Sequence, residues 1–428
     1  MAARPTFRMA VKFWLKLGLL SFGGPAGQIA LMHRELVEQK KWVEEARFLH
    51  ALNFCMLLPG PEATQLATYC GWLLHGVRGG LVAGALFVLP GALAMWGLSW
   101  IYVSFGAVPV VAGVLHGLKA AVVAILAVAV LRVGRKSLKT LIAWLLAVTA
   151  GVVLALGVAP FPVVVVVALA VGFFGVRRWP DAFGQTSTAS ASEAAVVNDA
   201  TQTRTVRETA WIGCIGLALW FGPVMGAAWL QGGDGLFTQL GWFFSKAAVV
   251  TFGGAYAVLP YVGQQAVEHY YWVTAPQMVD GLALAETTPG PLILVLQHVG
   301  FLAGWAQPGG LSPWAAATWG AVMTTWVTFV PTFLFILVGA PYVERCRGWV
   351  AWRGALAAVS AAVVGVIGQL AGWFAWHALW PRGGSAGVDF WVLGVAVAAG
   401  VALYWGRVGL GWVVLASGLA GAFSAVGL

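Results

Sequence analysis

The sequence predicts an all-α polytopic integral membrane protein, and three observations lead to that fold class. Of the 428 residues, 60% are hydrophobic and only 9% are charged, which is more apolar surface than a soluble domain needs. Apolar runs of about 18 or more residues recur along the chain, and each is long enough to cross a bilayer as a helix. The alternating pattern of an outer-membrane barrel is missing. We therefore expect an inner-membrane helical bundle.

The apolar runs predict about thirteen transmembrane helices. The first run has the charge of a signal peptide but no cleavage site, so we expect it to be retained. Most Lys and Arg residues fall in alternate loops, which places the N-terminus in the cytoplasm and the C-terminus in the periplasm. The expected spans are 10–32, 48–73, 80–104, 107–131, 138–158, 159–176, 208–230, 237–260, 277–303, 314–340, 350–378, 388–405 and 410–428. The loop after the first span mixes acidic and basic residues, so the first two segments either span the membrane or are re-entrant.

A polar segment divides the chain near its middle. Residues 181–207 are small and polar, and they cannot bury enough surface to offset the entropy of ordering them. We expect a flexible cytoplasmic linker there. It follows a first transmembrane repeat at 1–180 and precedes a connecting helix at 208–236 and a second repeat at 237–428.

The two halves resemble each other at a constant offset of 230 residues, which grows by an insertion of 11 residues in the second half. The matched features are Lys16 with Lys246, SFGG at 21–24 with TFGG at 251–254, PGP at 59–61 with PGP at 289–291, and Pro90 with Pro331. An odd number of apolar segments separates the starts of the two repeats, so we expect inverted topologies. Many secondary transporters are built in this way around one central site. A duplicated scaffold without a site is the alternative.

The PGP motifs lie where a membrane helix should be continuous. Proline removes a backbone donor and glycine weakens the helix, so each PGP should divide a span into two half-helices. Pro61 and Pro291 would then begin the second half-helices, whose free N–H groups favour anions. The FGG motifs offer a second break in each repeat. We expect the four breaks to converge on one anion, although a single such kink could merely help helices to pack.

Three lysines join the breaks as candidate ligands, because a lysine inside the hydrocarbon layer is costly and usually functional. For Lys16, snorkelling to the interface is the alternative. The expected substrate-binding residues are Lys16, Phe22, Gly23, Gly24, Pro59, Gly60, Pro61, Gln65, Lys119, Lys246, Phe252, Gly253, Gly254, Thr288, Pro289, Gly290 and Pro291.

Two carboxylates near the breaks are candidates for proton coupling. Glu62 would occupy the first turn of a half-helix, where a carboxylate simply stabilises the helix dipole. An ionised Glu62 would also repel a bound anion, so it is protonated, turned away from the site, or exchanges protons during transport. The same reasoning applies to Glu286.

The sequence disfavours several other classes. No His-Cys-Asp grouping has metal-ligand spacing, so we expect no metal, no cofactor and no enzyme activity. The phosphate-binding loop of ATPases is missing. The net charge of +9 is explained by the loops that orient the helices, so no nucleic-acid partner is expected. Membrane lipid is the expected environment, and a homodimer is plausible without any motif that indicates it.

The motifs resemble those of the chromate transporter family in its long two-domain form. The resemblance is carried by FGGP at 22–25, LPGP at 58–61 followed by Gln65, TPGP at 288–291 and the tandem halves, and it covers nearly the whole chain. It implies an inner-membrane protein that exports chromate from bacterial cells and confers chromate resistance. The chain departs from the family in one place, because several members carry His where this sequence has Gln28.

The residues themselves predict a secondary transporter of oxyanions that works by alternating access. Backbone N–H groups and lysines are donors, which suits chromate or sulfate better than partly protonated phosphate. Expelling a dianion from a cell that is negative inside gains about 4.6 kcal/mol per 100 mV. The alternatives are uptake of sulfate or another oxyanion, and an anion channel.

Overall fold

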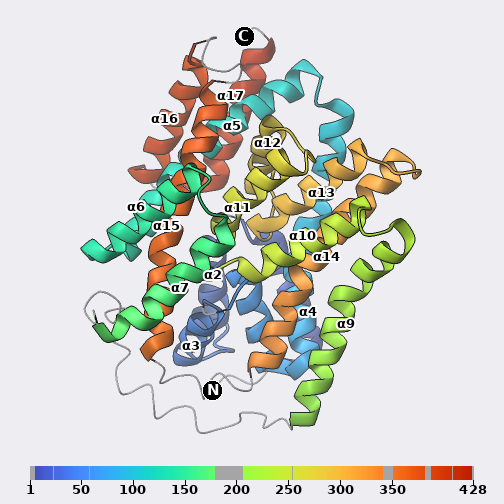
Figure 1. Ribbon diagram of the computed structural model, residues 1–428, viewed down its shortest axis with the longest axis vertical. Coiled ribbons are helices and arrows are strands. Elements are labelled where there is room, and N and C mark those ends of the chain that lie inside the picture. Colours follow the sequence, from blue (N-terminus) through green and yellow to red (C-terminus); the bar gives the residue numbers. More distant parts are fainter. Residues whose placement is uncertain are drawn as a thin grey trace.

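The computed structural model is helical throughout the part of the chain that it describes, which is residues 5–22, 24–56, 58–178, 206–252, 254–340, 350–380, 387–406 and 408–426. No strand occurs within these ranges, and the predicted all-α class is confirmed. Helix α3 (Glu45–Cys55) lies at one end of the molecule and α17 (Leu410–Val426) at the other (Figure 1). Residues 181–205 of the predicted linker lie outside the described residues.

The first half of the chain contains helices that are interrupted at the FGG and PGP motifs. Its elements are α1 (Phe7–Leu20), α2 (Gly24–His33), the π-helix η1 (Arg34–Gln39), α3, α4 (Glu62–Phe105), α5 (Pro109–Ser137), α6 (Leu141–Ala155) and α7 (Phe161–Arg178). The FGG motif separates α1 from α2, and the PGP motif separates α3 from α4.

The second half repeats this order of elements. After the connecting helix α9 (Val206–Gln231) come α10 (Leu236–Val250), α11 (Ala255–Gln264), the π-helix η3 (Gln265–His269), α12 (Ala275–Thr287), the 3₁₀-helix η4 (Leu292–Leu294), α13 (Val295–Ala306), α14 (Pro313–Gly339), α15 (Val350–Leu379), α16 (Phe390–Tyr404) and α17. FGG again separates the first two helices, a π-helix follows, and PGP forms the next break. The inverted orientation of the two halves stays a prediction.

Helix α4 reverses direction between the expected spans 48–73 and 80–104. Gly76 has a φ of 63°, a left-handed conformation that favours glycine. The two parts then pack so closely that a Cβ atom on Gly79 would lie 2.2 Å from the carbonyl oxygen of Gly71, and one on Gly84 would lie 2.3 Å from the Thr68 hydroxyl. The first part of α4 is therefore antiparallel to the second part. The first part begins after the PGP break and ends at the turn at Gly76.

The structure supports a multi-pass membrane protein without fixing the number of crossings. Among the described residues, six helices are long and apolar enough to span a bilayer, namely α4, α5, α7, α9, α14 and α15. An FGG or PGP motif divides each of the expected spans 10–32, 48–73, 237–260 and 277–303 into separate helical segments. The total of thirteen stays a prediction.

Candidate functional site

The breaks of the two halves bond to each other in a reciprocal pattern. The N–H group of Gly60 donates to the carbonyl of Thr251 at 2.7 Å, and the N–H group of Gly290 donates to the carbonyl of Ser21 at 2.9 Å. Gly60 and Gly290 occupy equivalent positions in the two halves, as do Ser21 and Thr251. The PGP segment of each half is thus held by the residue that precedes FGG in the other half.

Both central glycines of the PGP motifs need the conformation that they adopt. The φ angle is 125° at Gly60 and 92° at Gly290, where a side chain would be strained. The PGP motifs therefore form tight interior breaks, as the sequence predicts.

A half-helix begins directly after the first break. The N–H of Gln65 donates to the carbonyl of Pro61 at 3.0 Å, so the preceding N–H groups of the first turn have no acceptor within the helix. Free N–H groups and the positive end of the helix dipole favour an anion at such a terminus. After the second break, Pro291 precedes η4, so that half-helix begins with a 3₁₀ turn.

Two buried glutamines support the backbone at the breaks. The Gln65 amide nitrogen donates to the carbonyl of Pro59 at 2.7 Å. The Gln28 amide nitrogen donates to the carbonyls of Gly290 at 2.6 Å and Ser21 at 3.1 Å. Gln28 is the residue that departs from the family pattern, and its side chain joins the FGG segment of the first half to the PGP segment of the second.

Each candidate carboxylate lies beside the FGG segment of the opposite half. Glu286 is buried and accepts a hydrogen bond of 2.7 Å from the Tyr256 hydroxyl. This hydroxyl is 3.6 Å from the position that a Cβ atom would take at Gly24. One Glu62 oxygen is 3.9 Å from the equivalent position at Gly254. A buried carboxylate is costly unless it is paired, hydrogen-bonded or neutralised, and hydrogen bonding meets that condition for Glu286.

Lys119 forms an ion pair that the sequence analysis missed. Its amino group is 3.1 Å from the carboxylate of Asp280, and the Tyr102 hydroxyl donates to the other oxygen of that carboxylate at 3.0 Å. The available signal was an isolated aspartate inside an expected span, since ionisable residues in membrane helices are rare and usually functional.

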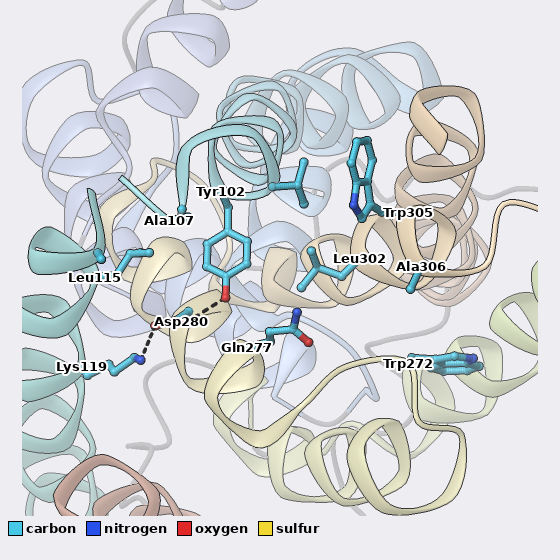
Figure 2. Close-up of a pocket in the computed structure, with 13 residues that line it drawn as sticks. Tyr102, Ala107, Leu115, Lys119, Trp272, Gln277, Asp280, Leu302, Trp305 and Ala306 are labelled. Atoms are coloured by element: carbon cyan, nitrogen blue, oxygen red, sulfur yellow. Dashed lines mark hydrogen bonds and ion pairs between the residues drawn. The ribbon is translucent and has the colours of Figure 1, made fainter. Parts of the chain in front are cut away.

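This ion pair lies on the wall of a cavity of about 450 Å³. The cavity is lined by residues from the end of α4, from α5, from the start of α12 with the segment before it, and from the end of α13. Figure 2 shows Asp280 between Lys119 and Tyr102, with Gln277 and Trp305 farther along the wall. The cavity thus combines one cation, one carboxylate and neutral polar groups with apolar walls, as small-molecule sites do.

The other two predicted lysines are exposed and differ in this from Lys119. Lys16 and Lys246 are exposed on α1 and α10, and neither forms an ion pair with any residue in the described ranges. The role of these two lysines in binding stays a prediction.

The remaining predicted residues belong to the FGG and PGP segments. Phe22 is exposed and Phe252 is half-buried. The Thr288 hydroxyl is buried and donates to the carbonyl of Ala285 at 2.9 Å. Gly23 and Gly253 lie outside the described residues. A binding role for this set also stays a prediction.

Comparisons with known proteins agree with the motifs. The family model described as chromate transporter matches residues 9–175 and 238–422. The chromate transport protein of Cupriavidus metallidurans is 30% identical, over 85% of this chain and 81% of its own length. The chromate transport protein of Pseudomonas aeruginosa is 34% identical, over 83% of this chain and 78% of its own length. The uncharacterized transporter YwrB of Bacillus subtilis is 34% identical, over 29% of this chain and 64% of its own length. No solved structure matches the chain.

Proposed function

The chain belongs to the chromate transporter family, and from this premise we propose that it exports chromate across the bacterial inner membrane as a secondary transporter and so confers chromate resistance. The observation that carries the proposal is the reciprocal bonding of the breaks, Gly60 to Thr251 and Gly290 to Ser21. Broken helices that meet between two repeats are how many secondary transporters form one central site.

We propose that the two halves move relative to each other about these bonds. Each bond joins a PGP segment of one half to the other half, so a rocking motion can open a path on one face while closing the path on the other. Alternating access then requires no new site. It requires only that the open path to the breaks switches from one face of the membrane to the other.

The substrate in this proposal is held by donors. The free N–H groups after Pro61 and the positive end of that half-helix attract an anion. Chromate accepts hydrogen bonds at every oxygen, so a site lined by donors suits it. In the cavity, Lys119 offers a cation, and Asp280 holds that cation when no oxyanion is present.

The membrane potential sets the direction of transport. Moving a dianion out of a cell that is negative inside gains about 4.6 kcal/mol per 100 mV, so export proceeds without ATP. Glu62 and Glu286 are the residues through which a proton gradient would couple to the cycle, because each lies beside an FGG segment.

Chromate flux into everted membrane vesicles tests the proposal. The vesicle interior corresponds to the periplasm, so export appears as uptake that saturates with chromate concentration. Vesicles that lack the protein are the control, and an imposed potential and a pH gradient are varied separately. We expect uptake that is driven by potential and inhibited by sulfate.

Two results would replace this function by another. Flux that rises linearly with concentration at high rates would indicate a channel. Sulfate transport toward the cytoplasmic face, with no chromate flux, would indicate oxyanion uptake.

A further inference from the structure

The two breaks have the same backbone hydrogen-bond pattern, with a positive φ at the central glycine. They differ in the side chains around them. Gln65 follows the first break, and the equivalent position after the second break is Val295. Thr332 on α14 faces the first break, and its equivalent on α4 is Gly91, which faces the second. Polar side chains around the first break are thus replaced by apolar or absent ones around the second break.

The second break is closed by its own neighbours. The Gly290 N–H donates to both the carbonyl and the hydroxyl of Ser21, at 2.9 and 3.1 Å, and the Gly290 carbonyl accepts from Gln28 at 2.6 Å. Gly91 packs so tightly against this segment that a Cβ atom on it would lie 2.2 Å from the carbonyl oxygen of Pro289. The polar groups of Gly290 are therefore satisfied, and the space beside it is filled.

The first break keeps polar groups without partners. Thr64, Gln65 and Thr332 are at most 1% exposed, and the hydroxyls of both threonines have no hydrogen-bond partner. The Thr332 hydroxyl and the Gln65 amide nitrogen are 3.2 and 3.0 Å from the position that a Cβ atom would take at Gly60. The Gln65 amide nitrogen donates one hydrogen to the carbonyl of Pro59 and has a second N–H group. Together with the Thr332 hydroxyl, it faces the same side of this break, beside the first turn of α4.

Unpaired hydroxyls in the interior of a membrane protein lower the stability of the fold, so their presence calls for an explanation. A buried polar group without a hydrogen bond destabilises the fold, and such groups in native proteins call for an explanation such as a ligand. The carbonyl oxygens of the Gln28 and Gln65 side chains also lack partners. One lies beside each break, so these two acceptors do not distinguish the breaks.

We propose that, of the two breaks, only the first binds the oxyanion, with the Thr332 hydroxyl and the Gln65 amide as its side-chain donors, and that the second break is a closed structural joint held by Gln28. This inference rests on the proposed function and specifies the site within it. The ligand is a tetrahedral oxyanion, chromate or sulfate, which accepts from these donors and from the N–H groups of the first turn of α4. Glu62 lies in that turn, so its carboxylate is neutral or turned away while the oxyanion is bound.

Two threonines on α14 provide a matched test. Thr332→Val removes the unpaired hydroxyl while keeping the shape of the side chain. Thr328→Val, one turn earlier, removes an equally buried hydroxyl that already donates to the carbonyl of Thr324 at 2.7 Å. In vesicles we expect Thr332→Val to raise the KM for chromate roughly tenfold, the effect of losing about 1.4 kcal/mol of binding. Thr328→Val should leave the KM unchanged, and Thr332→Ser should restore it.

The second break is tested by Gln28→Leu. We expect this variant to lower the melting temperature of the purified protein, because the Gly290 carbonyl loses its donor, while the KM of the folded protein stays the same. An increase in KM for Gln28→Leu together with an unchanged KM for Thr332→Val would overturn the inference.

A binding measurement separates this inference from the transport proposal. Chromate and sulfate are added separately to the purified protein, and the rise in melting temperature is recorded for the unaltered chain, Thr328→Val and Thr332→Val. A rise that is lost only in Thr332→Val supports the site, and the larger response identifies the preferred oxyanion, even if vesicles show no chromate flux. Equal responses in all three proteins, or no response to either oxyanion, would refute it.

Discussion

The geometry of the ion pair between Lys119 and Asp280 predicts how much the free energy of unfolding falls when one partner is removed. The two charged groups are 3.1 Å apart, with the Lys119 side chain 23% exposed and that of Asp280 7% exposed. At an effective dielectric constant of about 20, their attraction is about 5 kcal/mol before the cost of desolvation. Removing one partner of a buried pair typically costs about 3–5 kcal/mol. Because Lys119 retains some contact with solvent, we expect about 3 kcal/mol for Lys119→Met.

A double-mutant cycle measures this effect. Lys119→Met leaves the Asp280 carboxylate with the Tyr102 hydroxyl alone, whereas the double variant Lys119→Met/Asp280→Asn removes both charges. We expect the double variant to lose less free energy of unfolding than Lys119→Met and Asp280→Asn lose together, by a coupling of about 2 kcal/mol. The assay is reversible unfolding of the purified protein in mixed detergent micelles. Lys16→Met is the matched control, because Lys16 is exposed and forms no ion pair within the described residues.

Strict additivity of the two single variants would refute the reasoning, since it would mean that the charges do not stabilise each other. Equal losses in Lys119→Met and Lys16→Met would refute it as well. The same variants also report on transport. If Lys119 attracts the oxyanion in the cavity, the double variant should fold well yet transport chromate with a raised KM.

Three further predictions concern the breaks. Gly91→Ala should abolish transport, because the new Cβ atom would meet the Pro289 carbonyl at 2.2 Å, whereas Gly97→Ala on the same helix meets no atom within 4 Å and should transport normally; flux is compared at equal amounts of membrane protein. Glu62→Gln and Glu286→Gln should remove any stimulation of flux by a pH gradient, and stimulation that persists in both variants would show that these carboxylates do not couple protons. Lys246→Ala should stop transport without loss of protein from the membrane, and normal flux would exclude Lys246 from the site.

The positions of the breaks were predictable because their cause is local. Proline lacks an N–H group and glycine tolerates positive φ angles, so PGP and FGG interrupt a helix whatever surrounds them. The order of helices in the second half was predictable for the same reason, since the breaking motifs recur at a fixed offset.

The side-chain partners were not predictable, because they depend on distances in space. Asp280 lies 161 positions beyond Lys119, and Gln28 reaches Gly290 across 262 positions. The sequence also does not specify which face of a helix carries a lysine. Lys16 and Lys119 are both lysines within apolar runs, yet Lys16 is exposed and Lys119 forms a partly buried ion pair.

The reciprocal bonds between the breaks also have a consequence for the synthesis of the protein. Gly60 is made first, but its acceptor, Thr251, is translated roughly 190 residues later, which takes about 10–40 s at ~5–20 residues per second. During that interval the first half is in the bilayer with an interior break whose amide has not met its acceptor. The nascent first half is therefore an incomplete folding unit. Synthesis of the second half of the chain supplies the missing partners of both breaks.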